Sequence, residues 1–346
     1  MFDLSAFRTE NPSLTLSLVS KCFDDLCCHS QTDNQTTSMY VARSVAQDVL
    51  NKHGVRAEKL LDACTVNGDV LYSPTLVALL QAAASGEKKV FALIIVDVQN
   101  DFITGSLAVS EGEMVVPVIN EMGPHFTHIY KTADWHPTDH ISFHSNVKKC
   151  IHATSARSNV KGADSEMFQT VVVCGPPELK QTLWPDHCIQ GSFGAEFHKD
   201  LKTFPNEVRV NKGMKTTVDS YSGFWDNGDT SHTPLYNMLL NNGVTDVVVC
   251  GIATDFCVGF TALDAARHGF RTVVVNEAIR GVMPDTSAGM VARCKAAGVE
   301  FVSSASIPDL VKEKDVSGAV DRIFKVKKHF TVVDINANQQ YTPPVN

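Results

Sequence analysis

The amino-acid sequence predicts an α/β protein with three layers, in which helices cover both faces of a mainly parallel β-sheet. Short apolar segments rich in Val and Ile alternate with segments whose apolar residues recur at helical spacing. Strands of this apolar kind are typical of sheets buried on both faces. Polar and titratable residues follow directly after several of these segments, where sites in parallel sheets lie.

Residues 1–87 differ from the rest and are predicted to form a helical N-terminal extension. Two helices and the turn after them are expected at Leu14–Cys27, Met39–Ala63 and Thr65–Ser73. The order of helix, Gly-centred loop and helix suggests a degenerate EF-hand-like unit. However, Ala63 and Pro74 occupy loop positions where calcium binding needs Asp and Glu, so calcium binding is not expected.

Residues 88–310 are predicted to form the main domain, in which apolar strands alternate with amphipathic helices. The strands are expected at Phe91–Val96, Phe126–Ala133, Glu207–Val210, Val247–Cys250, Thr272–Val275 and Val299–Ser303. The helices are expected at Met114–Met122, Leu235–Asn241, Val258–His268 and Ser287–Ala297. Residues 144–183 interrupt the alternation and are interpreted as an insertion with one strand at Gln169–Cys174. Residues 311–346 are expected to form a C-terminal helix and a polar tail.

Composition and charge argue against several classes of function. The net charge of −8 disfavours a nucleic-acid partner, and no apolar run approaches the 18 residues of a membrane span. The first residues lack the pattern of a signal peptide, and the ten cysteines include no C-x-x-C pair. We therefore expect reduced thiols in the cytoplasm, with the nucleus also open, and a small-molecule substrate. A homo-oligomer is left open.

Cys257 is predicted to lie where a buried strand passes into a helix. The apolar run Val247–Cys250 ends at a Gly-containing turn, and helical spacing begins at Val258. Free N–H groups and the positive end of the helix dipole would favour a thiolate there and could hold an oxyanion. A buried structural cysteine is the alternative, and it is the commoner case for a cysteine taken alone.

Asp97 and Lys212 each end a predicted strand. Burial at a strand end would raise the pKa of the Asp97 carboxyl towards that of a general base. A lysine close to it and to Cys257 would pair with the carboxylate and favour the thiolate. The alternatives are an aspartate that caps a turn and a solvated lysine.

Asp134 and His136 end the second predicted strand of the main domain. Side chains alternate along a strand, so these two point to the same side. His187 could add a third ligand from a distant loop, which would leave open positions as in catalytic metal sites. Surface histidines in loops are the alternative.

Five motifs together carry a resemblance to a known family. They are V-D-V-Q-N-D-F, D-W-H-P-x-x-H-I-S-F, W-P-x-H-C, N-K-G and G-I-A-T-D-F-C-V, in this order within residues 88–306. The chain resembles the nicotinamidase branch of the isochorismatase-like cysteine hydrolases. The D-W-H and W-P-x-H-C motifs are specific to metal-bearing nicotinamidases within that group.

The resemblance implies the hydrolysis of nicotinamide to nicotinate and ammonia through a thioester. It implies a catalytic triad, carried here by Cys257, Asp97 and Lys212. It also implies one divalent metal ion, expected to be zinc, that would bind the pyridine nitrogen. The ligands would be Asp134, His136 and His187. His140 matches a position that is a ligand in some relatives and not in others.

The resemblance also implies how the substrate pocket is built. The backbone N–H groups of Ala253 and Cys257 would form the oxyanion hole, after a cis peptide bond at Ile252–Ala253. Phe102 and Trp184 match the aromatic residues that sandwich the pyridine ring. The insertion at 144–183 resembles that of eukaryotic members.

Two other functions stay open from the sequence. A relative could act on another amide or on isochorismate, although the predicted metal ligands argue against isochorismatases, which lack them. The fold could also be an inert binding protein whose N-terminal helices recruit a partner. The presence of Asp97, Lys212 and Cys257 argues against this, because an inert copy does not need all three.

Overall fold

The computed structural model describes residues 89–147, 165–173 and 179–312, together with parts of the first 88 residues. Those parts are residues 9–15, 17–19, 21–22, 25, 40–56, 58, 61, 65–66, 70–72 and 80. The predicted C-terminal helix and tail therefore lie outside the described residues from 313 onward, as does 148–164 of the insertion.

The centre of the described chain is a six-stranded sheet with the order β11-β10-β9-β4-β5-β8. Its strands are β4 (Phe91–Val96), β5 (His128–Asp134), β8 (Val208–Lys212), β9 (Asp246–Ile252), β10 (Arg271–Arg280) and β11 (Glu300–Val302). Each of the five pairings is parallel. The predicted parallel sheet is therefore confirmed, with all six strands found close to their expected positions.

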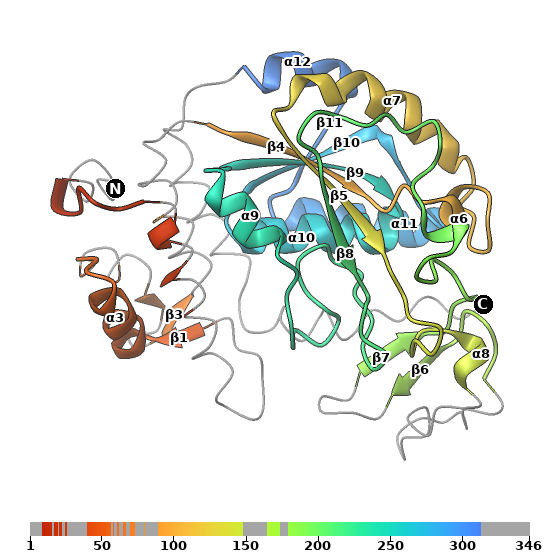
Figure 1. Ribbon diagram of the computed structural model, residues 1–346, viewed down its shortest axis with the longest axis horizontal. Helices are drawn as coiled ribbons and strands as arrows, with labels where there is room; N and C mark the ends of the chain where they lie inside the picture. Colours follow the sequence, from red (N-terminus) through yellow and green to blue (C-terminus); the bar gives the residue numbers. More distant parts are fainter. Residues whose placement is uncertain are drawn as a thin grey trace.

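Helices cover both faces of the sheet (Figure 1). One face carries α6 (Asn100–Ile103), α7 (Val115–Met122) and α12 (Ile307–Leu310), and the other carries α9 (Leu235–Asn241), α10 (Gly259–Arg267) and α11 (Pro284–Ala296). Short 3-10 turns occur at Gly112–Met114, Gly123–His125, Phe193–Ala195 and Ser304–Ser306. In β4, Phe91, Leu93 and Ile95 pack on the first face, and the residues between them pack on the second. Because both faces are covered, every residue of β4 and β9 is buried.

The insertion contributes α8 (His144–Val147) and an antiparallel pair, β6 (Thr170–Val173) with β7 (Leu179–Thr182). The strand expected at Gln169–Cys174 is confirmed as β6. Strand β7 was not predicted, because its sequence L-K-Q-T has neither an apolar run nor β-branched residues at most positions.

The N-terminal extension is not purely helical in the described residues. Helix α3 (Arg43–Lys52) lies within the expected Met39–Ala63. However, β1 (Tyr40–Ala42), β2 (Thr65–Val66) and β3 (Val70–Tyr72) form an antiparallel sheet in the order β1-β3-β2. The turn expected at Thr65–Ser73 is therefore wrong at both ends. An Asn-Gly pair between two β-favouring segments is a hairpin signal, and it outweighs the turn-only interpretation.

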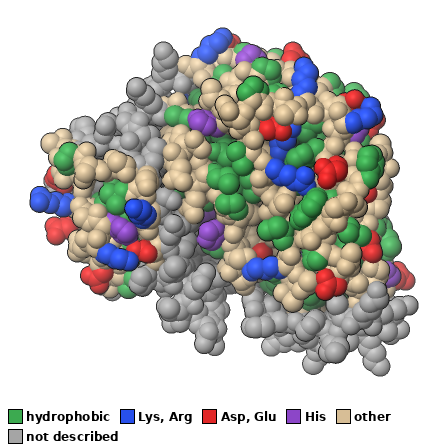
Figure 2. All heavy atoms as spheres, in the orientation of Figure 1, with side chains coloured by type: hydrophobic (Ala, Val, Ile, Leu, Met, Phe, Trp, Pro, Cys, Tyr) green, Lys and Arg blue, Asp and Glu red, His purple; other side chains and the backbone are tan. Residues whose placement is uncertain are grey.

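The described surface has mixed charge on the face shown in Figure 2, where Lys and Arg lie among Asp and Glu. None of the described helices has both the length and the apolar character that crossing a bilayer requires.

Candidate active site

Four of the predicted site residues meet at the carboxyl edge of the sheet. Asp97 directly follows β4, Asp134 ends β5 and Lys212 ends β8. Cys257 lies in a π-helical turn, Thr254–Val258, between β9 and α10. Since β9, β4, β5 and β8 are successive neighbours in the sheet, these residues converge although up to 160 positions separate them in sequence.

Lys212 is the centre of this cluster. Its Nζ lies 2.8 Å from Asp97 Oδ2, 2.6 Å from Asp134 Oδ1 and 3.3 Å from Cys257 Sγ. It also donates to the backbone carbonyl of Ser220 at 2.8 Å. All of these side chains are buried. The Lys212 ammonium therefore links the predicted nucleophile, the predicted base and a predicted metal ligand.

The protonation of this cluster follows from burial and from the two carboxylates. Burial alone would lower the pKa of Lys212, but Asp134 and Asp97 raise it well above its usual value. Burial raises the pKa of Asp97 to about 6, although Lys212 opposes this shift. Burial and the Asp97 carboxylate raise the pKa of Cys257 well above its usual value, against the effect of Lys212. Lys212 lowers the pKa of Cys257, as expected, but burial outweighs this effect, so Cys257 is a thiol that needs a base.

The turn before Cys257 requires an unusual backbone. Gly251 has φ +117°, and a Cβ on it would lie 2.0 Å from the carbonyl oxygen of Val96 in the neighbouring strand. Only glycine fits such a close approach without displacing that strand. The Ile252–Ala253 peptide bond is cis, as the family resemblance implied.

Asp134, His136 and His187 form a buried group that fits a divalent cation. His136 Nδ1 lies 2.8 Å from the Gly213 carbonyl, and His187 Nδ1 lies 2.7 Å from the Pro185 carbonyl. Each carbonyl oxygen accepts, so Nδ1 is the protonated nitrogen of both rings, and Nε2 of His136 and of His187 faces Asp134 Oδ2 at 3.5 and 3.9 Å. No described residue gives His136 Nε2 a hydrogen bond, although it is buried. A buried set of carboxylate and imidazole donors with one orphaned nitrogen is what a metal ion would complete.

His140 lies beside these ligands. Its ring stacks on His136 with centroids 4.0 Å apart, and its Nδ1 lies 2.7 Å from Ser142 Oγ. Its Nε2 is 4.0 Å from Asp219 Oδ1, and it too has no hydrogen-bond partner among the described residues. Burial lowers the pKa of His140 to about 3 and that of His187 to about 4, which keeps both neutral. Asp219 was missed in the sequence because it lies in a loop without a recognisable motif.

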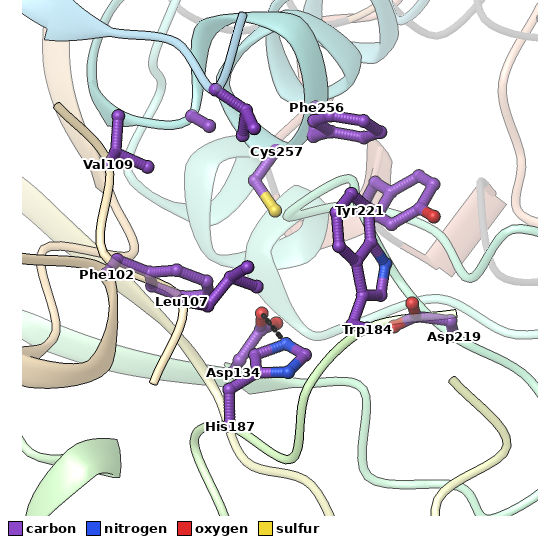
Figure 3. Close-up of a pocket in the computed structure, with 12 residues that line it drawn as sticks. Phe102, Leu107, Val109, Asp134, Trp184, His187, Asp219, Tyr221, Phe256 and Cys257 are labelled. Carbon is purple, nitrogen blue, oxygen red and sulfur yellow. Dashed lines mark ion pairs between the residues drawn. The ribbon is translucent and has the colours of Figure 1, made fainter. Parts of the chain in front are cut away.

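A pocket leads to Cys257, with about 410 Å³ of empty space when the open solvent at its mouth is included. Figure 3 shows Phe102 and Trp184, the two predicted aromatic residues, on opposite sides of the space between Cys257 and His187. Ala253 also lines this pocket. Sequence reasoning missed the remaining lining residues, which are Leu107, Val109, Asp219, Tyr221, Phe256 and Val282. Of these, only Phe256 carried a signal, since it precedes the cysteine.

Comparisons with known proteins show the family of the chain. A family model described as the isochorismatase domain matches residues 91–306. A nicotinamidase of Acinetobacter baylyi is 36% identical over 218 residues, which are 62% of this chain and 94% of that protein. A nicotinamidase/pyrazinamidase of Mycobacterium tuberculosis is 37% identical over 219 residues, which are 62% of this chain and 98% of that protein.

Solved structures give the same picture. A nicotinamidase/pyrazinamidase of Acinetobacter baumanii superposes with a TM-score of 0.55 at 37% identity, covering 63% of this chain and 97% of that one. The yeast nicotinamidase Pnc1p bound to the inhibitor nicotinaldehyde has a TM-score of 0.54 at 28% identity, covering 62% of this chain and 99% of that one.

Proposed function

The chain belongs to the isochorismatase domain family, and we propose that within it the protein is a nicotinamidase, which hydrolyses nicotinamide to nicotinate and ammonia. The observation that carries this proposal is the position of Lys212, which contacts Asp97, Asp134 and Cys257 at the base of an aromatic slot. One cation thereby joins an acyl-transfer triad to a metal-binding group.

The triad residues would act in sequence. Asp97 takes the thiol proton as Cys257 Sγ attacks the carboxamide carbon, and the pKa of about 6 suits a base near neutral pH. The C–N bond breaks as Asp97 returns the proton to the leaving ammonia, which leaves a thioester on Cys257. Water, deprotonated by Asp97, then attacks the thioester carbon and releases nicotinate, and Cys257 regains its proton. Lys212 holds Asp97 and Cys257 in register throughout.

Pocket residues would place the substrate for this attack. The flat ring fits between Phe102 and Trp184, and the N–H groups of Ala253 and Cys257 are proposed to hold the oxyanion. Asp134, His136 and His187 would hold a divalent metal, with zinc the expected ion. Bound there, the ion supplies a Lewis acid that can accept the lone pair of a ring nitrogen.

Ammonia release from nicotinamide tests the proposal. We expect the purified protein with added zinc to release ammonia and nicotinate in equal amounts, measured by a coupled ammonia assay and by chromatography. Benzamide is the matched control substrate, because it has the same shape but no ring nitrogen, and we expect it to react much more slowly. If isochorismate or another amide were turned over while nicotinamide was not, the protein would be a different hydrolase of the family. If metal bound but no substrate reacted, it would be an inert binding protein.

The pH dependence of activity should identify the base. Only ionised Asp97 can take the thiol proton, so we expect kcat/KM to fall as the pH drops below about 6. In Asp97→Asn this acid limb should vanish, with activity lower by at least about 100-fold. Asp229 is a matched control, because burial also raises its pKa to about 6 but it does not line the pocket. An acid limb lost in Asp229→Asn and kept in Asp97→Asn would contradict this assignment.

The proposed metal site can be tested by replacing, in turn, one histidine near each end of strand β5. His136→Asn removes a proposed ligand, and we expect it to weaken zinc binding by at least about 100-fold, by calorimetry on metal-free protein. His128→Asn is the matched control, because His128 begins the same strand β5 at the opposite edge of the sheet. Equal zinc affinity in the two variants would show that the ion binds elsewhere.

A further inference from the structure

Asp255 occupies a fully buried position two residues before Cys257. It lies in the same π-helical turn, Thr254–Val258, as the nucleophile. Its side chain does not line the pocket. A buried carboxylate needs hydrogen-bond donors, so the residues that supply them show what it holds in place.

The donors to Asp255 come from the loop before α11 and from the first turn of α11. Its Oδ1 accepts the backbone N–H of Val282 at 2.9 Å, and its Oδ2 accepts the backbone N–H of Met283 at 3.1 Å. Its Oδ2 also accepts the Thr286 hydroxyl at 2.5 Å. The loop leaves the end of β10 at Arg280 and enters α11 at Pro284. Asp255 therefore places a carboxylate beside the N-terminus of α11, where negative charge is favoured.

The same loop forms part of the pocket. Val282 of the loop and Cys257 of the turn both line the pocket. Asp255 therefore connects two segments that face the same substrate space. The packing around the carboxylate is tight. A Cβ on Gly281 would lie 1.8 Å from Ser287 Oγ and 3.2 Å from Asp255 Oδ1. The turn and the loop therefore have little freedom to shift independently.

The backbone of the turn that carries Cys257 is irregular. Phe256 has φ −128° and ψ −106°, which interrupts the helical backbone immediately before the nucleophile. The backbone N–H groups of Phe256 and Val258 both donate to the Ala253 carbonyl, which is itself part of the turn's entry. The Asp255 side chain hydrogen-bonds this irregular segment to the loop before α11 and to Thr286 in its first turn.

We propose that Asp255 is a positioning residue, which holds the Cys257 turn at a fixed distance from the pocket wall at Val282. This inference rests on the proposed function, since it concerns the same site. A displacement of about 1 Å in a nucleophile can cost about 100-fold in rate, so a rigid connection at this point has a direct catalytic value. Substrate binding depends on Phe102, Trp184 and the metal group, which Asp255 does not contact.

Asp255→Asn tests this role because all the groups that face Asp255 are donors. The amide nitrogen of Asn would face an N–H or a hydroxyl, so at least one hydrogen bond is lost. We expect kcat for nicotinamide to fall about 100-fold while KM changes less than about threefold. Glu277→Gln is the matched control, since Glu277 accepts from Ser303 Oγ and Ser304 N at 2.8 Å outside the pocket. The kcat of Glu277→Gln should stay within about twofold of wild type, because substitutions at the surface away from the site usually have small effects.

The kcat of each variant is corrected for any unfolded fraction, which circular dichroism measures. A corrected kcat within about twofold of wild type, or a higher KM with unchanged kcat, would overturn the proposal. If Asp255→Asn does not fold, Thr286→Val decides, because it removes one donor and keeps both backbone bonds. We expect it to lower kcat by about three- to tenfold at constant KM, and an unchanged kcat would overturn the proposal.

A substrate-independent measurement separates this inference from the proposed function. The alkylation rate of Cys257 by iodoacetamide, followed by mass spectrometry, should differ at least about threefold between Asp255→Asn and wild type. Failure of wild type to hydrolyse nicotinamide would end the proposed function, and the alkylation rates would then decide the role of Asp255. Equal rates would overturn it.

Discussion

Replacing Cys257 by Ala is expected to lower ammonia release by at least about 10⁴-fold, because no other group can form the acyl intermediate. The Cys257 sulfur lies 3.3 Å from Lys212 Nζ and lines the pocket. Its removal leaves the proposed metal ligands intact, together with Phe102 and Trp184. We therefore expect nicotinamide still to bind, which calorimetry with the metal-loaded variant would measure. Loss of turnover with retained binding would show that Cys257 has a catalytic role and not only a structural one.

Cys294→Ala provides the matched control for this substitution. Cys294 is an equally buried thiol in α11 and lies outside the pocket. It should lose some stability through the small cavity but keep its kcat. Activity that survived in Cys257→Ala, or disappeared equally in both variants, would rule out Cys257 as the nucleophile.

Lys212→Met is expected to produce the largest loss of stability of any substitution at the site. It leaves Asp97 and Asp134 buried without their shared cation, and removal of one partner from a buried ion pair costs about 3–5 kcal/mol. Turnover should also fall by at least about 1000-fold, since the variant no longer holds Asp97 beside Cys257. Urea denaturation of metal-free protein would measure the stability, because a bound ion would mask the change.

The control for this prediction is Lys131→Met, which removes another buried lysine. Lys131 also lies in a strand of the sheet, where its Nζ contacts Glu207 at 2.6 Å and the Lys202 carbonyl at 2.9 Å. Glu207 is 20% exposed and can be solvated, so we expect a loss of at most about 2 kcal/mol and a normal kcat. If Lys212→Met were as stable as wild type, the two carboxylates would not depend on Lys212 for their charge balance.

The sheet was predictable because its strands are short and apolar on both faces. Val247–Cys250 marked the centre of β9, and Thr272–Val275 marked the first half of β10. Their ends were not marked. Strand β10 continues through polar residues to Arg280 because Ile279 and Arg280 align with Gly251 and Ile252 of β9. Pairing of this kind depends on the neighbouring strand, so no local pattern reveals it.

The site was predictable where it follows strands and hidden where it lies in loops. Asp97, Asp134 and Lys212 each follow an apolar run, and parallel strands bring such ends together. Asp219 and Tyr221 reach the pocket from a loop whose sequence has no periodicity. The N-terminal strands β2 and β3 were missed for a different reason, since each is too short to show an alternating pattern.

By itself, the sequence determined the order of buried strands and the reactive groups at their ends, because both depend on residue type and local spacing. Tertiary structure alone decided the state of those groups. It placed Lys212 between two carboxylates and buried Cys257 so deeply that its pKa rises instead of falling. It also connected Asp255 to a loop that begins 26 residues later in the chain. Distances and desolvation set these properties, and both exist only once the chain has folded.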